Sequence, residues 1–227
     1  MKQSKLLFIF LFFFCASLTG QKKVVGLSSL ERELVHRGFV NVQRLDTTLY
    51  VNLKYATTDN FTGVVLYDAL TRAYLHPVAA EKLVKAHQLL KEYDPELRLL
   101  VYDGARPLSV QRRMYDVVKD TPLHSYVAHP DRTGLHNYGM AVDLTICDTS
   151  GEALDMGTPF DYFGRAAAIR DEEGLVREGL LTNQQVENRR LLRRIMIEAG
   201  FLSILGEWWH FNAVPLYEAR AKYQLIE

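Results

Sequence analysis

Residues 134–145, GLHNYGMAVDLT, place a histidine and an aspartate seven positions apart, with a glycine between them. The second half alternates like a strand, so Asp143 lies on its less apolar face, and Gly139 allows the preceding loop to fold His136 over that face. A carboxylate that is buried without a partner costs several kcal/mol. Asp143 must therefore face water, be paired or hold a metal ion. This stretch alone also allows a solvent-facing aspartate beside an unrelated loop histidine.

A second polar pair lies in GEWWHF, residues 206–211, where Glu207 and His210 stand among aromatic residues. A regular strand would put the two on opposite faces, but a turn that leads into a strand beginning at His210 would let both face one point. His136, Asp143 and His210 would then form a three-ligand site with an open fourth position, the arrangement of a catalytic zinc. Glu207 would be close enough to act as a general base toward a water molecule. The alternative is two structural tryptophans with incidental polar neighbours, which leaves the glutamate and the histidine unexplained.

A third cluster is VYDGARP, where Asp103 and Arg106 follow the end of an apolar run. Loops at strand ends, held by a rigid scaffold, often carry functional side chains. An arginine there could bind a carboxylate with two hydrogen bonds or stabilise an oxyanion beside a metal. An ordinary turn salt bridge of small energetic weight is the alternative.

Hydrophobic periodicity and breaker residues predict the elements that must carry these side chains. We expect a short helical piece within 21–38, one or two strands within 39–57, a helix at 78–93 after Pro77, a strand at 97–103, a helix from Ser109 to about 119, a long loop at 120–138, a strand at 139–147, a short helix near 163–170, a helix at 183–199 with a Thr182–Gln185 capping box, and a final strand or hairpin pair at 201–214. This mixture predicts an α+β fold with a mostly antiparallel central sheet flanked by helices.

The first twenty residues have a different character from the rest. A short basic head precedes the apolar run Leu6–Phe14, and small residues follow it. This layout predicts a secretory signal peptide over residues 1–20, and the run is too short to span a bilayer. A buried N-terminal helix is the alternative. Residues 21–227 are then expected to form a single exported domain, periplasmic or otherwise extracytoplasmic, with no integral membrane segment.

Charge is balanced over the whole chain, with 27 basic and 27 acidic residues. A near-neutral chain lacks the overall basic character that favours nucleic-acid binding. We therefore expect no nucleic-acid partner.

The motifs occur together in one known family. HNYGMAVD is similar to the pattern HxxGxAxD and EWWH to ExWH of the zinc D-alanyl-D-alanine dipeptidases, the VanX-type branch of the M15 peptidases. KYATTDNFTG, YDGARP, MGTPFD and NRRLLRRIM also resemble blocks of that family, in the same order, so that the resemblance runs from about Val40 to Phe211. It implies a fold like that of the Hedgehog domains and DD-peptidases. It also implies one Zn²⁺ per chain.

The resemblance implies a role for each matched residue. His136, Asp143 and His210 would bind the zinc, Glu207 would be the catalytic base, and Arg106 would stabilise the tetrahedral intermediate.

The substrate contacts that the resemblance implies come from three further residues. Asp161 would receive the free amino group of the substrate, Tyr55 would lie at the pocket edge, and Asp103 would orient Arg106. One position departs from the family, since Gly134 stands where a serine is usual. The missing hydroxyl removes a hydrogen bond and opens space beside the substrate.

The resemblance therefore implies zinc-dependent hydrolysis of the small dipeptide D-Ala-D-Ala. Two alternatives remain open. One is a D,D- or L,D-carboxypeptidase or endopeptidase of the same fold that acts on peptidoglycan stem peptides. The other is a zinc-containing binding module without turnover.

Overall fold

A computed structural model describes residues 26–227 of the chain. The predicted signal peptide, residues 1–20, lies outside the described residues. The helices are α1 (Ser29–His36), α2 (Pro77–Tyr93), α3 (Leu108–Val118), α4 (Glu172–Arg177), α5 (Asn183–Glu198) and α6 (Leu216–Lys222). The strands are β1 (Val40–Asn41), β2 (Tyr50–Val51), β3 (Tyr74–Leu75), β4 (Leu97–Asp103), β5 (Ala141–Asp148), β6 (Leu202–Ser203) and β7 (His210–Asn212).

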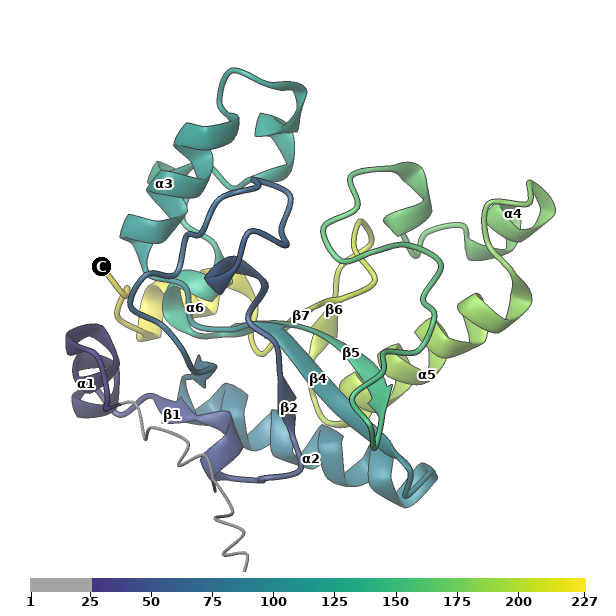
Figure 1. Cartoon of the computed structure of the whole chain (residues 1–227), viewed down its shortest axis with the longest axis horizontal. Helices are drawn as coiled ribbons and strands as arrows, with labels where there is room; N and C mark the ends of the chain where they lie inside the picture. The colour runs from purple at the N-terminus through teal and green to yellow at the C-terminus, as the bar shows by residue number, and fades with distance from the viewer. Residues whose placement is uncertain (1–25) are drawn as a thin grey trace, which may run out of the picture.

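The main sheet has five strands in the order β2-β4-β5-β7-β6. Only β2 pairs in parallel, and every other neighbour in this sheet is antiparallel. The long pair β4 and β5 forms its centre (Figure 1). β1 and β3 form a separate two-stranded sheet. The prediction of an α+β fold with a mostly antiparallel sheet is confirmed.

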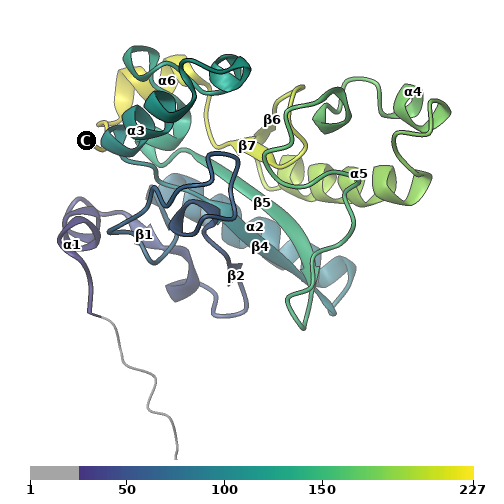
Figure 2. The same ribbon diagram turned by 45° about the horizontal axis from the view of Figure 1, so that its top comes forward.

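Helices α2 and α5 pack against this sheet. α2 contacts β4 and α5 contacts β5 and β6, and in both views α2 runs along one face of the long strands (Figures 1 and 2). Pro77 occupies the first turn of α2, as expected for a residue without an N–H to donate. Thr182 and Gln185 form the predicted capping box of α5. Both long helices therefore begin where local chemistry places their first turn.

Several elements differ from the prediction. α3 begins at Leu108, one residue before the expected cap Ser109, because Pro107 already provides the extended N-cap. The helix expected near 163–170 is only a 3-10 turn, Arg165–Ala167, and Asp171 caps a new helix, α4, by accepting from the Gly174 N–H. α6 was not predicted. Among residues 26–227, no helix is both long and apolar enough to cross a bilayer.

Gly139 connects the loop that carries His136 to β5. Its φ is +64°, a region that side chains disfavour, and its N–H donates to the His136 carbonyl oxygen. A Cβ at this position would lie 2.5 Å from the ring of Phe39 and 3.0 Å from the His76 nitrogen. Glycine is therefore required here for two separate reasons, conformation and space.

We expect Gly139→Ala to lower the free energy of unfolding by about 2–4 kcal/mol, from the left-handed backbone and the clash together. Gly179→Ala is the matched control, since Gly179 has φ +74° but nothing within 4 Å of an added Cβ. This control should lose only about 1–2 kcal/mol. Urea denaturation measures both values. Equal losses in the two variants would show that the Phe39 contact does not restrict position 139.

Candidate metal centre and active site

Three neighbouring strands present polar side chains at one level of the sheet. Asp103 at the end of β4 lies opposite Asp143 of β5, and Asp143 lies opposite His210, the first residue of β7. A register shift after Val101 brings Asp103, and not Tyr102, opposite Asp143. Such bulges re-aim side chains and are common beside active sites. The prediction that a strand begins at His210, with Glu207 on the turn before it, is confirmed.

His136 comes to the same point from the short 3-10 helix Leu135–Tyr138 that precedes β5. Its Nε2 is 3.3 Å from Asp143 Oδ2 and 3.3 Å from His210 Nδ1, and His210 Nδ1 is 2.9 Å from Asp143 Oδ1. These side chains form a group that could hold a metal ion, with ligand atoms all within 4.8 Å of one another. Tetrahedral ligands at zinc-like bond lengths lie roughly 3.4 Å apart, so the spacing fits such an ion.

The remaining nitrogen of each imidazole is bound to an oxygen that can only accept. His136 Nδ1 is 2.8 Å from the Gly104 carbonyl oxygen, and His210 Nε2 is 2.7 Å from Asn212 Oδ1. Each of these nitrogens therefore donates, which leaves the lone pairs of His136 Nε2 and His210 Nδ1 facing the centre. Partners of this kind orient metal-binding histidines. The donor set thus fits a divalent metal ion that takes nitrogen and oxygen ligands.

The charges of the cluster favour a cation at its centre. Burial acts to raise the pKa of Asp143, but the histidines outweigh it and hold that pKa well below its usual range. Burial acts to lower the pKa of His210, but the hydrogen bond and charge of Asp143 and the charge of Glu207 raise it to about 9. The buried carboxylate therefore stabilises positive charge beside it, whether a proton or a metal supplies that charge.

Glu207 lies beside this group. Its Oε2 is 4.0 Å from His210 Nδ1, and the side chain lines one cavity together with His136, Asp143 and His210. Burial raises the pKa of Glu207 above its ordinary value. A carboxylate with a raised pKa is better matched to proton transfer near neutral pH than an exposed one.

Arg106 is held rigidly on the other side. Its Nε and Nη2 donate to Asp103 Oδ2, its Nη1 donates to Gln111 Oε1, and its guanidinium lies 5.0 Å from the centroid of the Tyr55 ring. Asp103 is fully buried and does not line the cavity, and its second oxygen accepts from the Tyr67 hydroxyl. Asp103 therefore contacts Arg106, and its Oδ2 also lies 3.6 Å from His136 Nδ1, but it does not line the cavity. Arg106 faces the donor set through Nη2, which is 3.9 Å from Asp143 Oδ2.

Asp161 lies on residues 156–166, here called the Asp161 loop. Its φ is +59°, unusual for a residue that is not glycine, and Tyr55 donates its hydroxyl hydrogen to Asp161 Oδ2 at 2.9 Å. Burial and the charge of Asp143 raise the pKa of Asp161 well above its usual range. Backbone strain of this kind persists where the surroundings enforce it, often at functional sites.

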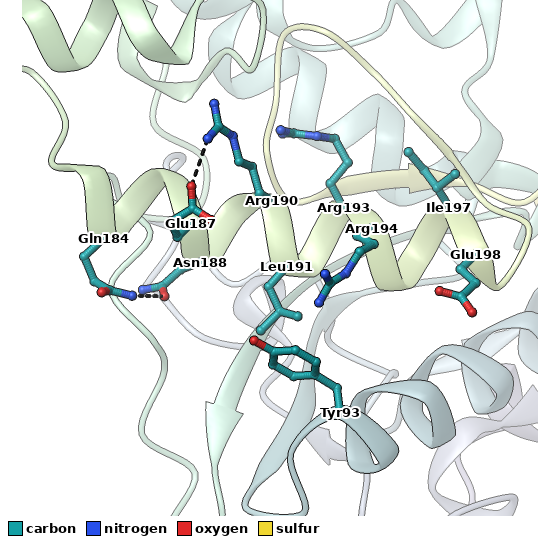
Figure 3. A pocket seen from close by; sticks show the side chains of 10 residues that line it. All are labelled: Tyr93, Gln184, Glu187, Asn188, Arg190, Leu191, Arg193, Arg194, Ile197 and Glu198. Atoms are coloured by element: carbon teal, nitrogen blue, oxygen red, sulfur yellow. Dashed lines mark hydrogen bonds and ion pairs between the residues drawn. The ribbon is translucent and has the colours of Figure 1, made fainter.

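One cavity of about 310 Å³ collects these groups. It is lined by Tyr55, Arg106, His136, Asp143, Asp161, Glu207 and His210, together with apolar side chains that include Phe61, Phe163 and Trp209. A larger hollow of about 680 Å³ lies over α5, but it is an open surface feature lined by three arginines and other mainly polar side chains (Figure 3). The smaller cavity therefore contains the side chains that could bind a metal ion and transfer a proton.

The M15 peptidase family, described as D-ala-D-ala dipeptidase, matches residues 35–222. The chain belongs to this family. A D-alanyl-D-alanine dipeptidase of Escherichia coli (strain K12) is 34% identical over 164 residues, which cover 72% of this chain and 78% of that protein. A D-alanyl-D-alanine dipeptidase of Enterococcus faecium is 31% identical over 193 residues, covering 77% of this chain and 90% of that protein. One of Streptomyces coelicolor is 30% identical over 195 residues, with 77% and 90% covered.

The structure of this M15 chain also shows partners that the motifs did not indicate. Asn212 orients His210, and its place two residues along the same strand was the one available signal. Tyr67 and Gln111 hold Asp103 and Arg106 from segments without a motif. Only the tertiary contacts identify these residues.

We expect Asn212→Leu to weaken metal affinity about 10–100-fold, because His210 loses the acceptor that fixes its tautomer. Competition with a chromophoric chelator measures the affinity. The unfolding midpoint of the metal-free variant should stay near that of the parent, which separates a loss of orientation from a loss of folding. Unchanged affinity would mean that Asp143 alone orients His210.

Proposed function

We propose that this M15 chain is a zinc-dependent dipeptidase that hydrolyses D-Ala-D-Ala to two molecules of D-alanine. The observation that carries the proposal is the combination, in one small cavity, of the His136–Asp143–His210 donor set, Glu207 and the separate carboxylate of Asp161. The names of the relatives support the choice of substrate. Two nitrogens and a carboxylate oxygen favour zinc among the divalent ions, and one ion per chain fits the one donor set found among residues 26–227.

When bound, zinc supplies a Lewis acid that makes the scissile carbonyl more electrophilic and a water molecule more acidic. Glu207 takes a proton from the attacking water and passes it to the leaving amine. Arg106 donates an N–H toward the oxygen that becomes negative as water adds to the carbonyl. Because Asp103 and Gln111 already hold the guanidinium, it does not have to reorganise as that charge forms.

In this proposal, Asp161 makes the enzyme specific for a free dipeptide. Its carboxylate pairs with the substrate ammonium, while Tyr55 holds one of its oxygens. A longer peptide has a neutral amide at that place and would leave a buried carboxylate unpaired. A carboxypeptidase acting on stem peptides would have no use for this charge.

Gly134 lines the same cavity without a structural need for glycine. Its φ of −118° suits any residue, and the nearest atoms to an added Cβ are 3.9 Å away. The cavity therefore has room at this position, and we propose that it tolerates dipeptides somewhat larger than D-Ala-D-Ala.

We also propose that the signal-like N-terminus exports the enzyme. An extracytoplasmic dipeptidase acts on dipeptide released from the cell wall, which fits recycling better than glycopeptide resistance. Fractionation of cells that produce the full chain tests this, and an uncleaved protein confined to the cytoplasm would contradict it.

We expect the purified chain to release D-alanine from D-Ala-D-Ala. A chelator should abolish the release and added Zn²⁺ should restore it. Glu207→Gln should keep its zinc but lose about 10²–10⁴-fold in kcat, because no group then accepts the proton from water. Metal analysis and an assay of free D-alanine measure both results. A parent chain that binds zinc but releases no D-alanine would support a binding module without turnover.

We expect Asp161→Asn to raise KM for the free dipeptide about 10–100-fold, because a charge-assisted contact with the ammonium is lost. Since the pKa of Asp161 is raised, its carboxyl becomes neutral at a higher pH than usual. The parent KM should therefore rise as pH falls through that pKa, and the KM of Asp161→Asn should lack this dependence.

The N-acetylated dipeptide is the matched control substrate. It has no ammonium and leaves the parent's buried carboxylate unpaired, so the Asp161→Asn variant should cleave it at least as well as the parent. Equal KM values for the free dipeptide in the two proteins would show that Asp161 does not bind the substrate ammonium.

A further inference from the structure

Both ends of the Asp161 loop are held by one side chain of α5. Arg189 Nε donates to the Met156 carbonyl oxygen at 2.6 Å, and Arg189 Nη1 donates to the Ala166 carbonyl oxygen at 2.9 Å. A guanidinium is a rigid planar fork, so two acceptors bound to it are fixed relative to each other. Arg189 therefore holds the two ends of the Asp161 loop close together.

Arg189 differs from the other arginines of α5. Arg190, Arg193 and Arg194 line the open hollow on the outer face of the helix, where Arg190 pairs with Glu187 (Figure 3). Arg193 pairs with Glu172, and Arg194 lies 5.0 Å from the centroid of the Tyr93 ring. Arg189 is only 1% exposed and faces the protein interior.

The buried guanidinium has no carboxylate within 4.0 Å among residues 26–227. Among the same residues, its Nη2 also has no hydrogen-bond partner. Burial lowers the pKa of Arg189 to about 10, so it remains a cation at neutral pH. A buried cation whose hydrogen bonds go only to backbone carbonyls is costly to maintain, and such a group calls for a specific explanation.

The same guanidinium also contacts the turn before β7, which carries Glu207. It lies 5.9 Å from the centroid of the Trp208 ring, and Trp208 Nε1 donates to Thr158 Oγ1 at 2.8 Å within the Asp161 loop. Trp208 directly follows Glu207 in the sequence. Arg189 thus links the Asp161 loop to the turn beside the donor set.

Further contacts from α5 hold the approach to the loop. Gln185 donates to the Asp155 carboxylate and Asn188 donates to the Asp155 carbonyl oxygen, each at 2.8 Å. At the tip, in contrast, the Asp161 carboxylate has one hydrogen bond among the described residues, from Tyr55. The backbone of Asp161 is strained, so its position depends on how the ends of the loop are held.

We propose that Arg189 is a positioning residue for Asp161, clamping the two ends of residues 156–166 together so that the carboxylate meets the ammonium of the substrate. This inference rests on the proposed function, in which Asp161 binds that ammonium. Arg189 does not touch the substrate, and the loss of its clamp acts only through the placement of Asp161. Its removal should therefore weaken the binding of free dipeptides and leave the chemistry on the scissile bond largely intact.

A mutant cycle with Asp161 tests the proposal, with zinc-loaded enzyme and D-Ala-D-Ala. We expect Arg189→Met to raise KM about ten-fold with kcat changed less than about three-fold, and Arg189→Lys to recover part of the loss. The double variant Arg189→Met with Asp161→Asn should bind no worse than Asp161→Asn alone, because a missing carboxylate cannot be misplaced. Arg190→Met, the exposed neighbour on the same helix, should match the parent.

Three outcomes would contradict the proposed role of Arg189. They are a parent-like KM in Arg189→Met, equal losses of kcat and kcat/KM in Arg189→Met, or a KM in the double variant raised by the product of the two single effects. If Arg189→Met does not fold, Arg189→Lys enters the same cycle and is judged by the same criteria. An Asp161→Asn variant with parent KM would instead contradict the proposed function, so the two failures are distinguishable.

Discussion

The convergence of three electron-pair donors in a buried place is the constraint on which the rest of the site depends. Asp143, His136 and His210 bring two lone pairs and a negative charge within 2.9–3.3 Å of one another. Without a cation between them these groups would repel, and their burial would be unfavourable. The register of β4, β5 and β7 and the left-handed turn at Gly139 enforce the convergence. The energy for it comes from the packed sheet and not from the donors themselves.

The fold uses two buried arginines in different ways around this centre. Arg106 is neutralised by Asp103 and faces the cavity, where a fixed positive charge can act on a developing oxyanion. Arg189 pairs with no carboxylate of the described part of the chain and binds the carbonyl oxygens of Met156 and Ala166. The first arginine is placed for chemistry and the second for the shape of a loop. Both lie in sequence blocks that resemble the M15 family, although only the first was assigned a role from the sequence.

Much of the fold could be predicted because local signals decide it. Pro77 marks the start of α2, the Thr182–Gln185 box marks the start of α5, and the apolar runs mark β4 and β5. α6 follows Pro215 much as α3 follows Pro107, but its 7 residues are too few for a clear periodicity. The helix expected near 163–170 failed because Asp171 caps the next segment instead. Short elements depend on tertiary packing, so periodicity alone does not predict them well.

The sequence by itself determined which residues could bind a metal, transfer a proton or receive a charge, because those abilities belong to side-chain types and to motifs of short span. It also determined the family, because the order of the motifs is a property of the chain. Only the tertiary structure decided which nitrogen of each histidine faces the centre, since the acceptor oxygens of Gly104 and Asn212 are aligned with the two rings only in the folded chain. It likewise decided that Tyr67 and Gln111 hold the Asp103–Arg106 pair and that Arg189 holds the two ends of the Asp161 loop. Several of these hydrogen bonds join residues far apart in sequence, and the short-range ones depend on how the folded backbone orients both side chains, which no local pattern encodes.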